Sequence, residues 1–313
     1  MPTSVVLQVL DVLLPVITAM INMSLESGQF ATTWKEALVL PILKKCGLEV
    51  AYNNFRPISN LSHVSKLAER AAAAQLTDHM TVNGLHLQLQ SAYKQHHSTE
   101  SALLKVKNDI LMNMDAQKVS LLVLLDLSAA FDTVSHEILL GRLKSRFGVN
   151  GKALAWFASY LTDHFQRISV NGGILSSFPL KQGVPQGSCL GPLLFTVYTS
   201  KLFDIVERHL PCVHCYADDT QLYLLFSPNA SGDEELAHGA MRDCIKDLRD
   251  WMTKDRLMLN DDKIEFLLIG TRQQLAKVNL TSISGYISKT SNTKLAAISR
   301  ATSSNSMLNS LCA

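Results

Sequence analysis

Two adjacent carboxylates, Asp218 and Asp219, lie between two apolar runs of the sequence, residues 210–215 and 222–226. Apolar runs on both sides of a short turn are typical of a β-hairpin, which would hold both acids at its tip. Like charges held side by side repel each other, so a fold that keeps them usually supplies a cation. An Asp-Asp pair is also common in an ordinary exposed turn, so the pair alone does not define a site.

A third acid follows a different expected strand. Residues 121–125 form a continuous aliphatic run that ends in Asp126, the pattern of a fully buried central strand. Together with Asp218 and Asp219 it would give three carboxylates converging on one edge of a sheet, and such oxygen ligands suit Mg²⁺ or Mn²⁺. Two such ions about 3.5–4 Å apart can activate an attacking hydroxyl and stabilise the leaving oxygen. The chemistry indicated is phosphoryl or nucleotidyl transfer.

Four residues separate Phe131 from Asp126, so a turn between them can bring the Phe131 ring under the same site. A flat aromatic ring there could stack beneath a sugar and exclude a 2′-hydroxyl. The alternative interpretation is an ordinary core phenylalanine.

Helices and strands must position these residues. Helical periodicity predicts helices over residues 5–25, 61–80, 98–114, 135–146, 151–161, 190–203 and 233–253. Apolar runs bounded by turn residues predict strands over residues 34–45, 121–125, 167–170, 174–180, 210–215, 222–226 and 264–269. Residues 53–60 should be extended, because a proline disfavours helix at the residue before it.

The first predicted helix is apolar enough to raise the question of a membrane. It contains Gln8, Asp11, Pro15 and Asn22, and no basic residue precedes it, which argues against a span or a signal peptide. We expect a helix that packs on the body of the protein and that Pro15 bends or breaks.

Composition sets broad limits. The 313 residues are 47% hydrophobic and 18% charged, which indicates a globular chain of one large or two ordinary domains. The net charge of +2 neither demands nor excludes a nucleic acid partner. Six scattered cysteines favour a reducing, intracellular setting. Residues 271–313 contain no Asp or Glu and no sustained period, so no structure is predicted there.

Three segments, Leu125–Asp132, Gly183–Ser188 and Tyr216–Asp219, resemble successive motifs of a reverse transcriptase. Three flanking segments are similar to those of LINE-type (non-LTR, jockey-like) retrotransposons: Asn54–Ser59, His97–Glu100 and Leu259–Lys263. The resemblance covers about residues 34–270.

This resemblance implies an α+β fold, the fingers and palm of a right-hand polymerase, with an antiparallel palm sheet backed by helices. The expected divisions are a helical lead-in over 1–33, fingers over 34–118, palm over 119–270 and a divergent tail over 271–313. Neither the thumb nor the endonuclease that usually accompanies this polymerase is recognisable, so we expect the fingers and palm of a longer element.

The resemblance also implies roles in catalysis. Asp126, Asp218 and Asp219 would bind two Mg²⁺ ions, with Mn²⁺ as a substitute. Lys263 matches a lysine proposed to protonate the leaving pyrophosphate, although an exposed lysine at the end of a strand is the alternative. Phe131 would be the steric gate that favours deoxynucleotides.

Four more residues would contact substrates. Gln186 and Gly187 would line the nucleotide and template pocket, where backbone must approach a base closely. Tyr216 would support the primer terminus, and the guanidinium of Arg56 could reach the triphosphate.

The implied function is an RNA-directed DNA polymerase that extends a DNA primer on an RNA template with deoxynucleoside triphosphates. An inactive or domesticated fragment that binds nucleic acid is the alternative, and Phe131 disfavours an RNA-dependent RNA polymerase. A retrotransposon polymerase would act in the nucleus, without a membrane partner. The sequence leaves the oligomeric state open.

Overall fold

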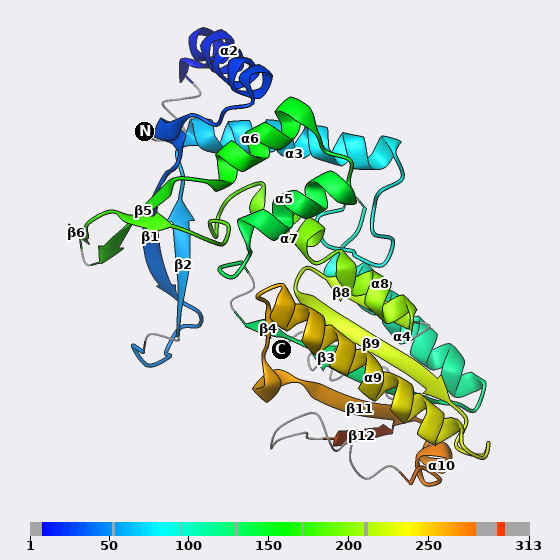
Figure 1. Ribbon diagram of the computed structural model, residues 1–313. Coiled ribbons are helices and arrows are strands. Elements are labelled where there is room, and N and C mark those ends of the chain that lie inside the picture. Colours follow the sequence, from blue (N-terminus) through cyan, green and yellow to red (C-terminus); the bar gives the residue numbers. More distant parts are fainter. Residues whose placement is uncertain are drawn as a thin grey trace. The chain divides into compact units, whose positions relative to one another are not determined.

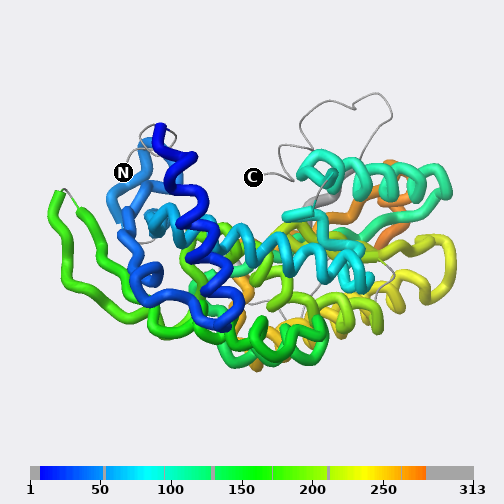
Figure 2. Tube along the Cα trace, turned by 90° about the horizontal axis from the view of Figure 1, so that it is seen from above, coloured from blue at the N-terminus to red at the C-terminus, as the bar shows by residue number. Residues whose placement is uncertain are grey.

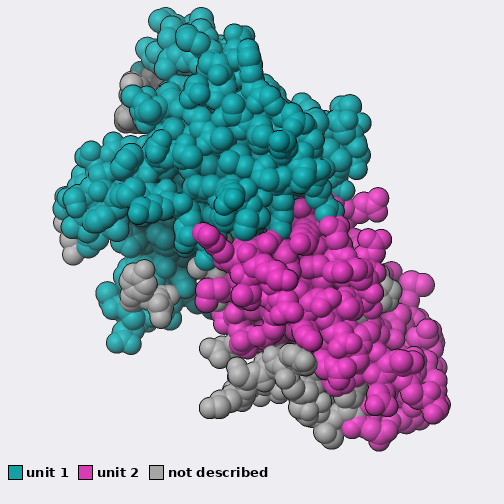
Figure 3. Space-filling model, viewed as in Figure 1, with its two compact units in different colours: residues 1–86, 131–198 teal, residues 87–130, 199–313 magenta. Residues whose placement is uncertain are grey.

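The computed structural model describes residues 8–51, 54–94, 96–128, 131–170, 172–209, 212–279 and 293–297. The chain divides into two compact units, each drawn from two stretches of sequence (Figure 3). Unit 1 contains residues 1–86 and 131–198, and unit 2 contains residues 87–130 and 199–313. The division into fingers over 34–118 and palm over 119–270 stays a prediction.

Unit 2 is built on a five-stranded sheet with the order β12-β11-β3-β9-β8 (Figure 1). The strands are β3 (Val119–Leu125), β8 (Cys212–Tyr216), β9 (Asp219–Phe226), β11 (Glu265–Gly270) and β12 (Thr293–Ala297). Strand β3 is central and antiparallel to both β9 and β11, β8 is antiparallel to β9, and β12 is parallel to β11. The expected antiparallel sheet around a buried aliphatic strand is confirmed.

Helices cover this sheet on both faces. Unit 2 contains α4 (Thr99–Asp115), α8 (Lys201–Glu207), α9 (Asp233–Lys254) and α10 (Arg272–Leu275). Helices α4 and α9 lie on opposite faces of the sheet (Figures 1 and 2). Helix α4 buries Val106 and Ile110 against Leu122 and Tyr223 of the sheet. Burial of each such aliphatic side chain contributes about 1.5–3 kcal/mol, so α4 holds the sheet firmly.

Unit 1 combines a second sheet with a group of helices. The sheet has the order β2-β1-β5-β6, with β7 paired to β5. Its strands are β1 (Glu36–Leu43), β2 (Phe55–Asn60), β5 (His164–Val170), β6 (Gly173–Ile174) and β7 (Phe178–Leu180). The helices are α2 (Leu10–Ser27), η1 (Thr32–Trp34), α3 (His63–Val82), α5 (His136–Ser145), α6 (Gly151–Leu161) and α7 (Gly191–Tyr198). In the core, the Phe30 ring meets those of Trp34, Trp156 and Tyr160 edge to face, at 5.4, 5.4 and 5.1 Å.

Helix α2 packs on α3 and α6, as expected, but it continues unbroken through Pro15. The expected break at Pro15 is wrong, because contacts with α3 and α6 hold the later turns although the proline removes one hydrogen bond of the helix. A bend at Pro15 stays a prediction. Ser24 is buried there and its hydroxyl accepts a hydrogen bond from Trp156 Nε1 at 3.0 Å. Among the described helices, α2 alone is long and apolar enough to cross a membrane, a test that core helices and signal sequences also pass.

Two predicted elements are each divided in the structure. The helix expected over 190–203 is two helices, α7 and α8, separated at Thr199 and Ser200. The division into units falls after Tyr198, and short hydroxyl side chains compete for backbone hydrogen bonds inside a helix. The strand expected over 174–180 is likewise β6 and β7, which pair with different parts of β5.

The expectation of no structure after residue 270 is also wrong for part of that segment. Helix α10 lies there, and β12 pairs with β11. Strand β12 is five residues long and pairs with a strand more than twenty residues earlier, so no local period announces it. The rest of 280–313 lies outside the described residues.

Candidate active site

The carboxylate pair sits at a tight turn in unit 2. Strand β8 ends at Tyr216 and β9 begins at Asp219, and these two residues pair across the hairpin. Ala217 and Asp218 therefore form a two-residue turn, and Ala217 has a φ of +58°, in the left-handed region. A residue with a Cβ pays about 1–2 kcal/mol in that conformation, so its surroundings must hold it there.

Asp126 belongs to the same end of the sheet. Leu125 pairs with Thr220, so the next step of the antiparallel register puts Asp126 opposite Asp219. Adjacent strands lie about 4.8 Å apart, which brings their carboxyl groups within electrostatic reach. The pKa of the Asp219 carboxyl is raised, first by loss of solvation and then by the negative charges of Asp218 and Asp126. The structure thus brings the three acids together.

Asp126 also has two bonded partners. Its Oδ2 accepts hydrogen bonds from Lys263 Nζ at 3.0 Å and from Asn260 Nδ2 at 3.1 Å, and its backbone carbonyl accepts one from the Asn260 amide at 2.9 Å. The side chain of Lys263 is 65% exposed, so its ion pair with Asp126 adds little stability. Asn260 had no role in the sequence-based prediction. Asn260 belongs to the segment Leu259–Lys263, which the resemblance had singled out. Its hydrogen bonds to Asp126 form only when Met258–Leu259 pairs with Leu127–Ser128, more than a hundred residues earlier in the chain.

A short segment after α9 presents Asn260 and Lys263. It contains β10 (Met258–Leu259), which pairs with β4 (Leu127–Ser128), and the 3₁₀ helix η3 (Asp261–Lys263). Two nitrogens of Arg249, on α9, donate to the two carboxylate oxygens of Asp261. A bidentate pair of this kind fixes orientation as well as distance, so it anchors η3.

The donor chemistry fits the expected ions, because Asp126, Asp218 and Asp219 supply the carboxylate oxygens that Mg²⁺ and Mn²⁺ prefer. Within the described ranges, however, no three His, Cys, Asp or Glu side chains are arranged to hold a metal ion. One oxygen of Asp126 bonds to Lys263 and Asn260 instead. A cation would therefore compete with the Lys263 ammonium for that oxygen.

Two tyrosines border the acids. Tyr216 is half-buried at the end of β8. The pKa of Tyr93 is raised, first by loss of solvation and then by the negative charges of Asp218 and Tyr216, so Tyr93 lies within electrostatic reach of both. The sequence had not marked Tyr93, since it falls between two predicted helices in a stretch without a period.

The second group of predicted residues lies in unit 1, where the loop 183–188 packs tightly on other backbone. Ser59 N donates to the carbonyl of Gln186 at 2.6 Å, and a Cβ on Gly187 would lie 2.7 Å from the Ser59 carbonyl oxygen. Gly187 has a φ of +109° and Gly183 a φ of +83°. A Cβ on Gly183 would lie 2.9 Å from the carbonyl oxygen of Phe131. Only glycine fits at both positions.

Phe131 and Arg56, both predicted to contact the nucleotide, differ in burial in unit 1. The Phe131 ring is half-buried and lies 4.9 Å from the ring of Phe195 on α7, centroid to centroid. Arg56 is exposed on β2, where alternation puts its side chain on the opposite face from that of Ser59. The structure therefore groups Phe131 with the Gln186 loop, and it directs Arg56 to the other face of β2.

A buried acid holds the end of that loop. Glu69, on α3, is fully buried, and its Oε2 accepts hydrogen bonds from the backbone amides of Cys189 at 2.6 Å and Leu190 at 3.3 Å. Burial raises the pKa of Glu69, and these two amides lower it in part. Free amides at a helix start attract negative charge, so Glu69 caps the entry into α7. The sequence had not marked Glu69.

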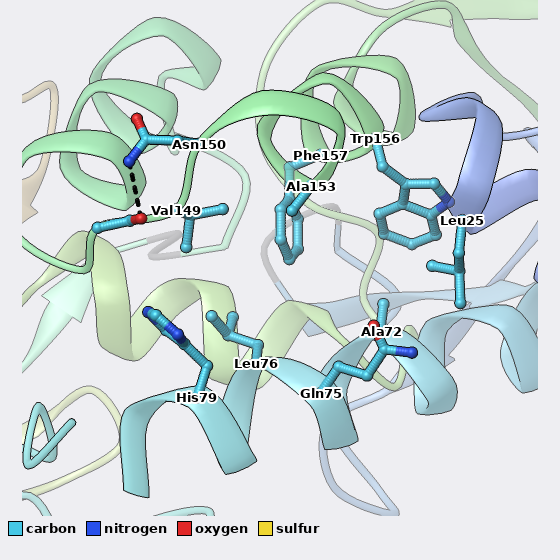
Figure 4. A pocket seen from close by; sticks show the side chains of 11 residues that line it. Leu25, Ala72, Gln75, Leu76, His79, Val149, Asn150, Ala153, Trp156 and Phe157 are labelled. Carbon is cyan, nitrogen blue, oxygen red and sulfur yellow. Dashed lines mark hydrogen bonds between the residues drawn. The ribbon is translucent and has the colours of Figure 1, made fainter. Parts of the chain in front are cut away.

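A cavity of about 350 Å³ also lies in unit 1 (Figure 4). Its walls come from α2, α3 and α6 and the loop before α6, and the lining is largely apolar, with Leu76, Trp156 and Phe157 among the contributors. None of the predicted site residues lines it. It is not part of the candidate active site.

Solved structures place the fold in a known class. The chain is similar to apo telomerase from Candida tropicalis, truncated from its C-terminal domain, with a TM-score of 0.52 and 15% identity over 77% of this chain and 51% of that one. It is also similar to Candida albicans telomerase, in complex with a fragment of telomeric RNA, with a TM-score of 0.50 and 13% identity over 80% of this chain and 43% of that one. At this identity the likeness shows the fold alone, and it confirms the right-hand polymerase fold.

The family follows from the sequence comparison. The model of the family described as reverse transcriptase (RNA-dependent DNA polymerase) matches residues 42–296. Because this match spans most of the chain, the chain belongs to the reverse transcriptase family. The match also extends past residue 270 into the segment that contains α10 and β12.

Curated relatives confirm the non-LTR branch. A probable RNA-directed DNA polymerase from transposon BS of Drosophila melanogaster is 32% identical over 239 residues, which are 75% of this chain and 26% of the relative. The RNA-directed DNA polymerase from mobile element jockey of the same organism is 30% identical over 215 residues, 67% of this chain and 23% of the relative. The chain thus spans about a quarter of the length of these relatives.

Proposed function

We propose that this chain is the polymerase part of a jockey-like non-LTR retrotransposon and extends a DNA primer 3′-hydroxyl on an RNA template. The observation that carries the proposal is the shared electrostatic site of Asp126, Asp218 and Asp219 at one end of an antiparallel sheet. Family membership and the relatives' printed activity support the substrates: RNA template, DNA primer and deoxynucleoside triphosphates. A retrotransposon polymerase of this kind would work in the nucleus.

The three aspartates would hold two Mg²⁺ ions, or Mn²⁺. When bound, such ions activate the attacking hydroxyl and stabilise the leaving pyrophosphate. Lys263 would donate a proton to that pyrophosphate, since its exposed ammonium already lies 3.0 Å from Asp126. Tyr216 would support the primer terminus from the end of β8.

The residues of unit 1 would select the nucleotide. Phe131 would exclude a 2′-hydroxyl, and the backbone of Gln186 and Gly187 would approach the base. The close backbone packing at Gly183 and Gly187 and the cap from Glu69 support this role, because these contacts hold the loop in place. Arg56 would reach the triphosphate only from the face of β2 opposite to the Ser59 side chain, and the exposure and fork geometry of its guanidinium suit phosphate oxygens.

Primer extension on an RNA template with Mg²⁺ and deoxynucleoside triphosphates tests the proposal. Asp218→Asn should lower the extension rate about a hundredfold or more, since a positioned charge is lost from the site. Asp78→Asn is the matched control, because it removes one exposed aspartate from α3 in unit 1 and should leave the rate unchanged. No extension by soluble, folded wild-type chain, with either Mg²⁺ or Mn²⁺, contradicts the proposal.

One observation favours the second candidate, a chain that binds nucleic acid without catalysis. Asp126 is bonded to Lys263 and Asn260, and no group of three acids in the described residues is arranged around an ion. Fluorescence anisotropy of a labelled RNA–DNA duplex separates the two candidates. Tight binding without extension at any metal concentration supports the second.

A further inference from the structure

Gln90 reaches the turn that carries the carboxylate pair, from a segment with no assigned role. It is 2% exposed and belongs to unit 2, as the turn does. Its Oε1 accepts a hydrogen bond from the Ala217 amide at 3.0 Å, and its Nε2 donates to the Ala217 carbonyl at 3.2 Å. One side-chain amide thus satisfies both backbone groups of the residue that precedes Asp218.

The backbone on both sides of Gln90 fixes this arrangement. Cys215 N donates to the Leu89 carbonyl at 2.8 Å, and Ser91 N donates to the Cys215 carbonyl at 2.9 Å. Gln90 therefore forms a parallel bridge with Cys215 at the edge of β8. Its Oε1 also accepts from the Ala92 amide at 3.0 Å, so the amide group cannot turn away from Ala217.

The turn requires such a partner for two reasons. Ala217 is held at a φ of +58°, which residues with a Cβ rarely adopt. The last strand pair of the hairpin is Tyr216 with Asp219, so the strand pairing supplies no partner for the Ala217 amide and carbonyl. The partner must also be neutral, because an acid would add repulsion to the three carboxylates and a base would form ion pairs with them. A glutamine offers one donor and one acceptor without charge.

We propose that Gln90 is a positioning residue that sets the backbone of the Ala217–Asp218 turn and, through it, the direction in which Asp218 and Asp219 present their carboxylates. The backbone part of this inference stands on the hydrogen bonds alone. Its catalytic consequence rests on the proposed polymerase function.

Three variants test it. Gln90→Met keeps the length and apolar bulk but loses both hydrogen bonds to Ala217. Gln90→Glu keeps the acceptor for the Ala217 amide and loses the donor to its carbonyl. Ser91→Ala is the matched control, because this buried neighbour bonds to His214 at 3.0 Å and not to the turn.

The first measurement, residue-resolved amide hydrogen exchange, does not depend on activity. The Ala217 amide should exchange about tenfold faster in Gln90→Met, as expected for loss of one buried bond, while amides in the middle of β9 keep their protection. Ser91→Ala should protect Ala217 as the wild type does, and Gln90→Glu, which keeps the acceptor for the Ala217 amide, should protect it better than Gln90→Met does. Unchanged Ala217 exchange in a folded Gln90→Met protein overturns the proposal, whether or not the chain is a polymerase.

The second measurement is primer extension at varied Mg²⁺ concentration. Gln90→Met should lower kcat about tenfold and raise the Mg²⁺ concentration for half-maximal rate, with an unchanged KM for the primer–template. A role in folding alone would lower the active fraction without moving the Mg²⁺ dependence. If Gln90→Met does not fold, Gln90→Glu decides: wild-type kcat and Mg²⁺ dependence in that variant overturn the proposal.

Discussion

Two segments of this molecule, the turn at Ala217–Asp218 and the loop 183–190, carry reverse transcriptase motifs. Each is held by one buried side chain from a distant part of the chain. Gln90 holds the turn at Ala217 in unit 2 with a neutral amide, whereas Glu69 holds the loop before α7 in unit 1 with a carboxyl group. The turn exposes one amide and one carbonyl, which need a donor and an acceptor together. The loop runs into a helix start, where only amides are unpaired and an acceptor with negative charge fits best.

This difference suggests different vulnerabilities. The unit 2 turn sits beside three carboxylates, so a charged partner there would alter their electrostatics. The unit 1 loop needs close backbone contact at Gln186 and Gly187 rather than charge. A titratable side chain, Glu69, is therefore tolerated where the loop ends, at Cys189 and Leu190. We therefore expect damage in unit 2 to change rate more than stability, and damage in unit 1 to change stability and selectivity.

Lys263→Met offers the largest expected effect and tests the unit 2 side. If Lys263 protonates pyrophosphate, kcat should fall about a thousandfold, as general-acid loss allows. The free energy of unfolding in urea should change by less than about 1 kcal/mol, because the pair with Asp126 is exposed. Lys254→Met, which removes an exposed lysine at the end of α9, is the control for charge. Equal rates in both variants would identify Lys263 as an ordinary strand-end lysine.

Glu69→Leu tests the unit 1 side. Removal of the carboxylate leaves the Cys189 and Leu190 amides without their acceptor, so the free energy of unfolding should fall by about 3 kcal/mol. Urea denaturation measures this, and Asp78→Leu on the exposed side of α3 is the control. A change no larger than that of the control would mean that Glu69 does not hold the loop.

Phe131→Ala should give a smaller effect, confined to selectivity. Loss of the ring should raise ribonucleotide incorporation relative to deoxynucleotide about tenfold, the scale on which apolar walls discriminate. Phe165→Ala removes an exposed aromatic of the same unit and should leave the ratio unchanged. An unchanged ratio for Phe131→Ala as well would make Phe131 a core residue packed on Phe195.

The sequence could predict the acids better than their supports. Asp126 and Asp218-Asp219 mark the ends of apolar runs, and the ends of neighbouring antiparallel strands meet, so their convergence follows from pattern alone. Gln90 and Glu69 act over 127 and 120 residues of chain, and nothing local distinguishes a clamping side chain from a surface one. The division of the helix expected over 190–203 could not be predicted either, because it falls where the two units separate and the local sequence does not mark that boundary.

The smallest expected effect is a change in pH dependence that separates the two clamps. The folded pKa of Glu69 lies above its ordinary 4.5, so the folded state binds this proton more tightly than the unfolded state. Stability should therefore fall as pH rises from 4.5 through the raised pKa, and Glu69→Gln should remove that fall. Gln90→Met should keep it, since an amide does not titrate.

Other titratable groups, Asp219 and His164 among them, also make the unfolding free energy depend on pH, so a single curve is ambiguous. The raised pKa of Asp219 acts in the same direction as that of Glu69, from its ordinary value of 3.8. His164 acts oppositely, because burial lowers its pKa to about 4 and stability falls as pH drops from 6.5. The quantity to measure is therefore the difference in unfolding free energy between wild type and each variant across pH 4–8. A free-energy difference that changes with pH for Glu69→Gln and stays constant for Gln90→Met supports a titrating clamp in unit 1 and a neutral clamp in unit 2. Equal slopes for the two variants would contradict this electrostatic difference between the clamps.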